Sequence, residues 1–137
     1  MGGRGSASGA RRLNNGTIIP YGSEYHAVFE DGDIKFVIPN TINTTAPMDT
    51  MTKGRIYVTL DYKQEPKFIT MYDDSGKRTL QIDLSGKSHW VNGEKLDPPH
   101  VHLGYNHDEN GSRKPNSYEE SLIERVNTLW RQFTASK

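Results

Sequence analysis

Four of the five histidines in this sequence lie between positions 89 and 107, and two of them are separated by a single residue. The segment 100–103 reads His-Val-His-Leu, and this alternation of polar and aliphatic residues is typical of a short strand. Because successive side chains of a strand point to opposite faces, His100 and His102 share one face. We expect Val101 and Leu103 to enter the core, which leaves the two imidazoles side by side at the surface.

Two adjacent imidazoles suit acid and base catalysis at a phosphodiester, because near neutral pH one can be protonated while the other is neutral. In this interpretation His100 and His102 are the candidate catalytic residues. The residues that could bind the substrate around them are His89, Tyr105, His107, Arg113 and Lys114. This mechanism uses no metal ion, and the sequence predicts no cofactor.

Two other interpretations of the histidine cluster stay open. His100 and His102 are spaced for metal coordination, with His89, His107 or Asp108 completing the site. The cluster could also be structural, because histidines near proline-rich turns often hydrogen-bond only to loop backbone.

The composition is that of one small domain. The chain has 137 residues, of which 33% are hydrophobic, and its 17 Lys and Arg residues balance 17 Asp and Glu residues. Because the charges balance, the chain lacks the excess of positive charge that is the simplest indication of a nucleic-acid partner. The lack of cysteine excludes disulfides and thiolate metal sites. The longest apolar runs are three residues, so we expect no membrane span, no secretory signal and a cytoplasmic location.

Residues 1–16 are rich in glycine and serine and have no hydrophobic periodicity, which predicts a disordered basic leader before a single domain at 17–137. Arg4, Arg11 and Arg12 have no acidic neighbour in this leader. They are the candidate partner-binding residues, although a leader of this kind can also serve only solubility.

Two hairpins are predicted from turn residues between alternating segments. The first joins residues 25–30 to 34–38 across Asp31-Gly32 and pairs Phe29 with Ile34. The second joins residues 67–72 to 78–84 through a loop with Gly76 in the left-handed conformation, and it pairs Phe68 with Ile82.

The rest of the chain supplies one strand, one loop, a small hairpin and a helix. A long loop at 39–54 precedes a strand at 55–60, and Asn92-Gly93 closes a hairpin between 89–91 and 94–96. Near the C-terminus, Ser117 and Glu120 form a capping box, and Leu122, Val126 and Leu129 follow at helical spacing.

These elements predict an α+β fold in which a mainly antiparallel sheet of about five or six strands packs against one C-terminal helix. The predicted core residues are Phe29, Phe36, Ile38, Ile56, Val58, Phe68, Leu80, Ile82, Val101, Leu122, Val126, Leu129 and Trp130.

Several segments between Phe68 and Phe133 carry a resemblance. They are Tyr72-Asp-Asp-Ser-Gly-Lys-Arg78, Gln81-Ile-Asp83, Pro99-His-Val-His-Leu-Gly-Tyr105 and the C-terminal Glu-Arg-Val-Asn-Thr-Leu-Trp130. Together with the Gly-Gly-Arg-Gly leader, they resemble small proteins encoded by bacteriophages and integrative elements of Gram-positive bacteria, and terminal domains of phage head-associated proteins. The resemblance implies a genetic setting and no mechanism. The hairpin followed by Pro-His-x-His is also similar to toxin-type domains, in which such histidines imply nuclease chemistry.

Two functions follow as hypotheses. The first is a phage- or mobile-element-encoded interaction protein that binds a host or phage protein or nucleoprotein without turnover, such as an anti-defence inhibitor (an anti-CRISPR, for example) or a head-associated factor. The second is a toxin-like, metal-independent ribonuclease or phosphodiesterase that uses His100 and His102, for which RNA is the candidate substrate. Neither hypothesis involves a membrane.

Overall fold

The computed structural model describes residues 10–12, 18–20, 24–40, 44–86, 88–91, 93–106 and 109–136. Its elements are β1 (Ala10–Arg12), β2 (Ile18–Pro20), β3 (Tyr25–Asp31), β4 (Ile34–Pro39), β5 (Ile56–Leu60), β6 (Pro66–Tyr72), β7 (Arg78–Asp83), β8 (His89–Val91), β9 (Glu94–Leu96), β10 (His100–Leu103), β11 (Ser112–Arg113) and α1 (Ser117–Ala135). Strands β1 and β2 pair with each other, so three residues of the predicted leader 1–16 lie in a strand.

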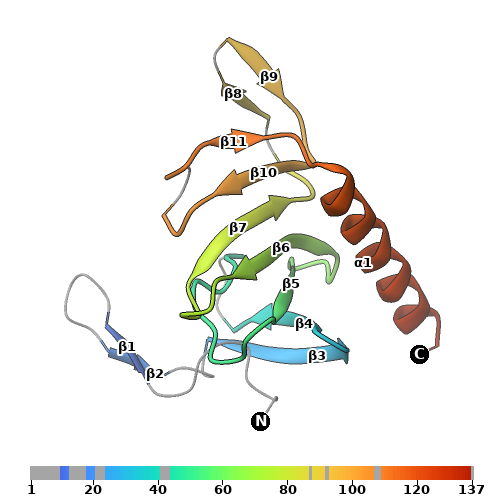
Figure 1. Cartoon of the computed structure of the whole chain (residues 1–137). Helices are drawn as coiled ribbons and strands as arrows, with labels where there is room; N and C mark the ends of the chain where they lie inside the picture. The colour runs from blue at the N-terminus through green and yellow to red at the C-terminus, as the bar shows by residue number, and fades with distance from the viewer. Residues whose placement is uncertain are drawn as a thin grey trace.

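A seven-stranded sheet in the order β11-β10-β7-β6-β5-β4-β3 forms the body of the protein, and helix α1 runs across one of its faces (Figure 1). Every neighbouring pair is antiparallel except β4 and β5, which are parallel. The predicted α+β fold is therefore confirmed, with slightly more strands than expected. Within the described part of the chain, no helix is long and apolar enough to cross a membrane.

One row of apolar residues crosses the sheet beneath the helix. Its members are in register on five successive strands and have no exposed surface: Phe36, Val58, Ile69, Ile82 and Val101. Leu122, Val126 and Trp130, one helical turn apart, pack onto this row from α1. Most of the predicted core is confirmed here, but Phe68 is absent from this cluster because Ile69 takes the helix-facing position.

The register of both large hairpins differs from the prediction, by two residues beside the β3–β4 turn and by one residue over most of β6–β7. The β3–β4 turn is Gly32-Asp33, with Asp31 opposite Ile34, because Gly32 takes the positive φ (59°) at the first turn position. Phe29 therefore lies opposite Phe36, and a bulge at Val28 then sets Ala27 opposite Val37. In β6–β7, Gly76 has the expected positive φ (86°), but Ile69 and not Phe68 lies opposite Ile82.

Residues 44–50, between β4 and β5, lie on the second face of the sheet, away from the helix. Parallel neighbours require a crossover connection, and the predicted loop at 39–54 supplies it. The phenol groups of Tyr25 and Tyr72 donate hydrogen bonds to the carbonyl oxygens of Thr45 (2.6 Å) and Pro47 (2.5 Å). The second face is thus covered over β3, β5 and β6, where polar residues such as Thr50 and Thr70 are buried.

The helix starts one residue earlier than predicted. Asn116 is the N-cap and accepts from the backbone N–H of Glu119, whose carboxylate accepts from the backbone N–H of Asn116 (both 2.9 Å). The predicted box of Ser117 and Glu120 is wrong, because asparagine serves as an N-cap as well as serine does and Glu119 also has a partner in Arg113.

Candidate functional site

His100 and His102 lie on the second face of the sheet, and both contact Asp83 of the neighbouring strand. Antiparallel pairing of β7 with β10 sets His100 opposite Asp83 and His102 opposite Gln81. The Oδ2 atom of Asp83 lies 3.3 Å from Nε2 of His100 and 3.1 Å from Nε2 of His102. The two imidazole centroids are 4.8 Å apart, which confirms that the histidines are neighbours on one face.

Asp83 was not among the sequence-based candidates. The Gln81-Ile-Asp83 alternation indicates that Gln81 and Asp83 share a face, but only the pairing of β7 with β10 brings that face to the histidines. A second oxygen of Asp83, Oδ1, accepts a hydrogen bond from the Gln81 side-chain amide (2.8 Å). Arg78 in turn donates to Oε1 of Gln81 (3.0 Å) and to the carbonyl oxygen of Tyr105 (2.7 Å).

Ser112 of the edge strand β11 completes the cluster. It lies opposite His102, and its hydroxyl is 3.0 Å from Nδ1 of that imidazole. With Asp83 ionised, His102 can donate from Nε2 to Asp83 and accept at Nδ1 from Ser112, so a single neutral tautomer satisfies both contacts. We call Asp83, His100, His102 and Ser112 the β7–β10 cluster.

The β7–β10 cluster is buried, which corrects the expectation of surface imidazoles. His100 has no exposed surface and His102 is 4% exposed, whereas the Asp83 side chain retains 14%. The prediction was wrong because it assumed that only one face of the sheet faces a core. An RNA phosphate could contact these imidazoles only after the residues around them move.

Electrostatics favour the charged form of Asp83 inside this cluster. Burial by itself raises the pKa of Asp83, but hydrogen bonds from His102 and Gln81 and the charges of both imidazoles outweigh it. The net result is a pKa below the ordinary value, so Asp83 is an anion at neutral pH. The site is therefore a partly buried carboxylate between two imidazole nitrogens.

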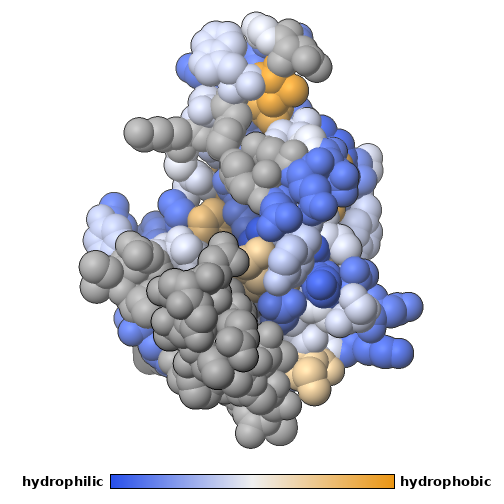
Figure 2. All heavy atoms as spheres, turned by 90° about the vertical axis from the view of Figure 1, so that its left-hand side faces the viewer, coloured by the Kyte–Doolittle hydropathy of each residue, from blue (hydrophilic) through white to orange (hydrophobic). Residues whose placement is uncertain are grey.

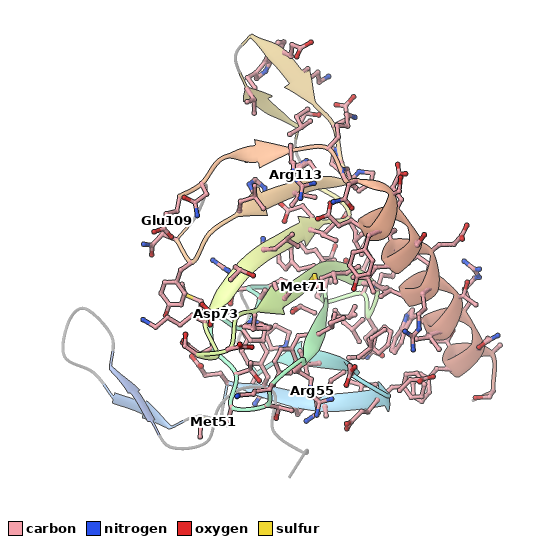
Figure 3. The ribbon with its side chains drawn as sticks, viewed as in Figure 1. Met51, Arg55, Met71, Asp73, Glu109 and Arg113 are labelled. Carbon is pink, nitrogen blue, oxygen red and sulfur yellow. The ribbon has the colours of Figure 1, made fainter. Side chains whose placement is uncertain are left out.

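Arg113 lies on the helix side of β11 and does not face the cluster, because adjacent strand residues point to opposite faces. Figure 3 labels Arg113 near the start of the helix. Its guanidinium forms two hydrogen bonds with the carboxylate of Glu119, at 2.7 and 2.8 Å. Burial opposes the charge of Glu119 (3% exposed), but the hydrogen bond from Arg113, the largest effect, holds the pKa of Glu119 below its ordinary value. Arg113 is thus engaged at the helix N-terminus rather than held ready for a phosphate.

The remaining predicted substrate-binding residues are dispersed or lie outside the described part. Lys114 is exposed beyond β11, and the Tyr105 hydroxyl contacts Asp49 (3.3 Å) with the Lys77 ammonium over its ring. The side chain of His89, and His107 and Asp108 entirely, are not described by the structure. The same holds for Arg4 and for the side chains of Arg11 and Arg12.

A second feature of the described surface is the β8–β9 hairpin, which projects beyond β10 and β11 at the top of Figure 1. The predicted pairing of 89–91 with 94–96 is confirmed, with Gly93 at φ 83° in the turn. Trp90 lies in this hairpin, opposite Lys95, and 71% of its surface is exposed. Figure 2 views the side away from the helix, where scattered hydrophobic spots lie on a mainly hydrophilic surface, one of them at the level of this hairpin; tryptophan itself is near neutral on the hydropathy scale of the figure.

The described residues thus offer a buried polar cluster and an exposed aromatic hairpin. The cluster has the chemistry to hold a cation or to relay a proton, and the hairpin has the shape and composition of a contact site. No family model, curated protein or solved structure matches this chain.

Proposed function

We propose that this protein is a small binding protein that recognises another protein through the β8–β9 hairpin and catalyses no reaction. The observation that carries the proposal is Trp90, a large aromatic side chain that is 71% exposed on a projecting hairpin. Burial of a tryptophan releases a large area of apolar surface from water, and such residues commonly dominate the binding energy of protein interfaces.

The hairpin is a defined element rather than a loose loop. Its strands pair over three residues each, and the hydroxyl of Ser88 donates to the carboxylate of Asp97 at its base. Hydrogen bonding from Ser88 lowers the pKa of Asp97. A hairpin with paired strands and a hydrogen bond at its base loses less conformational freedom on binding than a flexible loop does, which favours affinity.

The exposed side chains of the hairpin indicate which groups the partner surface would present. Trp90 and Lys95 are cross-strand neighbours, and Lys95 is 58% exposed with a distant ion pair to Asp97 (3.9 Å). A complementary surface would have an apolar pocket for the indole with an acidic group beside it. The resemblance to proteins of phages and integrative elements supports a host or phage protein as this partner and a cytoplasmic site of action, as for an anti-defence inhibitor or a head-associated factor.

The test compares two exposed aromatic residues. Immobilised wild-type protein, Trp90→Ala and Tyr62→Ala are exposed to nuclease-treated lysates of a Gram-positive host with and without phage infection. Tyr62 is 85% exposed and lies on the turn between β5 and β6, so it controls for general aromatic stickiness. The captured partner is then purified, and its affinity for each variant is measured by interferometry.

We expect Trp90→Ala to weaken binding about 30-fold, the equivalent of about 2 kcal/mol, and Tyr62→Ala to change it less than about 3-fold. The proposal fails if no saturable partner is captured, or if both variants bind as wild type does. Deletion of residues 1–16 tests the arginines of the leader. If the leader is a binding arm, its deletion should lower the affinity, and most strongly at low salt. If it only aids solubility, its deletion should leave the affinity unchanged.

Phosphodiester cleavage remains the second candidate because His100 and His102 are adjacent and share one carboxylate. Its test is incubation with labelled RNA and DNA, with and without EDTA, for wild type and for His100→Ala and His102→Ala. A metal-independent acid–base pair would cleave in EDTA with a bell-shaped pH profile, and each variant would lose roughly 10²- to 10⁴-fold in rate. Absence of cleavage by the wild type removes this candidate and leaves the binding proposal intact.

A further inference from the structure

The β7–β10 cluster has the composition and spacing of a metal site. Asp83, His100 and His102 each offer one ligating atom, and the three atoms all lie within 4.8 Å of one another. Because β7 and β10 are hydrogen-bonded neighbours, the sheet itself fixes the spacing of these side chains. This arrangement does not depend on the flexible ends of long side chains.

Two of the three distances between ligand atoms in the cluster are close to those of a coordination polyhedron. Ligands of tetrahedral zinc lie about 2.0–2.1 Å from the ion, which makes the distance between two ligand atoms about 3.3–3.4 Å. The two distances from Asp83 Oδ2 to the imidazole Nε2 atoms are 3.3 and 3.1 Å. The distance to His100 equals the polyhedron edge, and the distance to His102 lies between this edge and the length of about 2.9–3.0 Å of an ordinary N–H···O hydrogen bond. All three ligand atoms lie within 4.8 Å of one another, so an ion would draw them together by small side-chain rotations.

Neighbouring residues hold the ligands in the orientation that a metal needs. Gln81 donates to Oδ1 of Asp83 at 2.8 Å, which directs Oδ2 toward the imidazoles. The Ser112 hydroxyl lies 3.0 Å from Nδ1 of His102, which directs Nε2 toward Asp83. Outer contacts of this kind orient ligands in metal sites, and a hydroxyl can accept from Nδ1–H once the ion has taken Nε2.

We propose that Asp83, His100 and His102 bind one divalent first-row transition metal ion, with zinc as the preferred ion. Two imidazoles with one carboxylate suit zinc and its neighbours, whereas magnesium and calcium require six or more oxygen ligands. The ion would crosslink β7 to β10 beside the two buried histidines. Three protein ligands would leave its fourth coordination position for water, which is the ligand number of an open zinc site rather than of a closed structural one. This inference goes beyond the proposed binding function and does not depend on it.

The first measurement is zinc retention by untagged protein. Wild type is mixed with a twofold excess of zinc, separated from free ion by gel filtration, and analysed by elemental mass spectrometry. We expect about one zinc per chain, and a melting temperature raised by about 5 °C with zinc but unchanged with magnesium or calcium. Cobalt(II) in place of zinc should give the visible absorption bands of a cobalt ion with nitrogen ligands.

Variants assign the retained ion to the cluster. Asp83→Asn and His102→Gln should lose retention and the thermal shift. His26→Gln should keep both, because His26 is an exposed histidine on β3 that contacts Asn40 and lies outside the cluster. Circular dichroism establishes that each variant is folded before the comparison is made.

Three results would overturn the proposal. The first is that the wild type retains no zinc after gel filtration, and the second is that folded Asp83→Asn protein retains as much zinc as the wild type. The third is that His26→Gln loses as much zinc as the cluster variants do. A wild type that retains no zinc overturns the proposal even if both cluster variants fail to fold. Zinc retention and the cobalt spectrum involve no binding partner, so failure here leaves the proposed function untouched.

Discussion

Replacing Glu119 by Gln removes the charge that joins the helix N-terminus to the edge strand β11. The Glu119 carboxylate is 3% exposed and accepts three hydrogen bonds, two from the Arg113 guanidinium and one from the backbone N–H of Asn116. Hydrogen bonds to charged groups contribute about 1.5–3 kcal/mol each when one partner is removed. Arg113 is 39% exposed and can regain water, and Gln keeps one acceptor oxygen, so we expect a net loss of about 2 kcal/mol.

This loss is measured as the free energy of unfolding in urea at pH 7, and as a fall of roughly 8 °C in melting temperature. Glu120→Gln is the matched control, because Glu120 lies in the same helical turn but is exposed. Glu120→Gln weakens only the interaction of this side chain with the helix dipole, so its loss of stability should be no more than about 0.5 kcal/mol. Equal losses in the two variants would refute the assignment of the capping box to Asn116 and Glu119.

The pH dependence gives a second check on the same residue. The pKa of Glu119 in the folded state lies below its ordinary value of 4.5, chiefly through the hydrogen bond from Arg113. A lowered folded pKa means that the stabilisation is fully present above pH 4.5 and is lost as pH falls through the folded pKa. The difference between wild type and Glu119→Gln should therefore shrink below pH 4.5, and a difference that stays constant down to pH 2.5 would contradict the reasoning.

Three other substitutions test the packing. Trp130→Phe removes the indole hydrogen bond to the Gln64 carbonyl (3.1 Å) and part of a ring stacked on Phe36, so we expect a loss of about 1–2 kcal/mol in urea unfolding. The same variant leaves Trp90 as the only tryptophan, and its fluorescence should be quenched by acrylamide as strongly as that of a free indole. Gly76→Ala should cost about 3 kcal/mol or more, because its new methyl group would lie 2.2 Å from the Thr50 carbonyl oxygen. Gly93→Ala has nearly the same positive φ (83° against 86°) but open space around it, so it should change global stability by less than about 1 kcal/mol; equal costs would indicate that backbone strain alone decides both.

Local patterns predicted the elements better than they predicted the register. The helix and the Asn92-Gly93 hairpin were found because their signals lie within a few residues of each other. In β6, Phe68 and Ile69 are adjacent apolar residues, so alternation alone does not say which of them faces the helix. The register then had to be predicted from the length and position of the turn. A bulge in each large hairpin changes the pairing by one further residue along the strand.

The candidate site shows the same division between local and distant information. The common face of His100 and His102 follows from a spacing of two residues, and it was predicted correctly. Their burial and their contact with Asp83 depend on the pairing of β7 with β10, which are separated by the whole β8–β9 hairpin. Only the completed sheet contains that information, so no local pattern could have supplied it.

The parallel contact between β4 and β5 has a consequence for how the chain folds during synthesis. It divides the sheet into an N-terminal hairpin and a later group of strands that pair through local turns, from β5 to β7. The helix bridges the two parts, since Phe133 stacks on Phe29 of β3 (4.5 Å) while Glu119 is held by β11. This helix is made after all seven strands, so a growing chain exposes the apolar row of the sheet until residues 117–135 have left the ribosome. Chaperone contact should therefore be greatest late in synthesis and end when the helix docks.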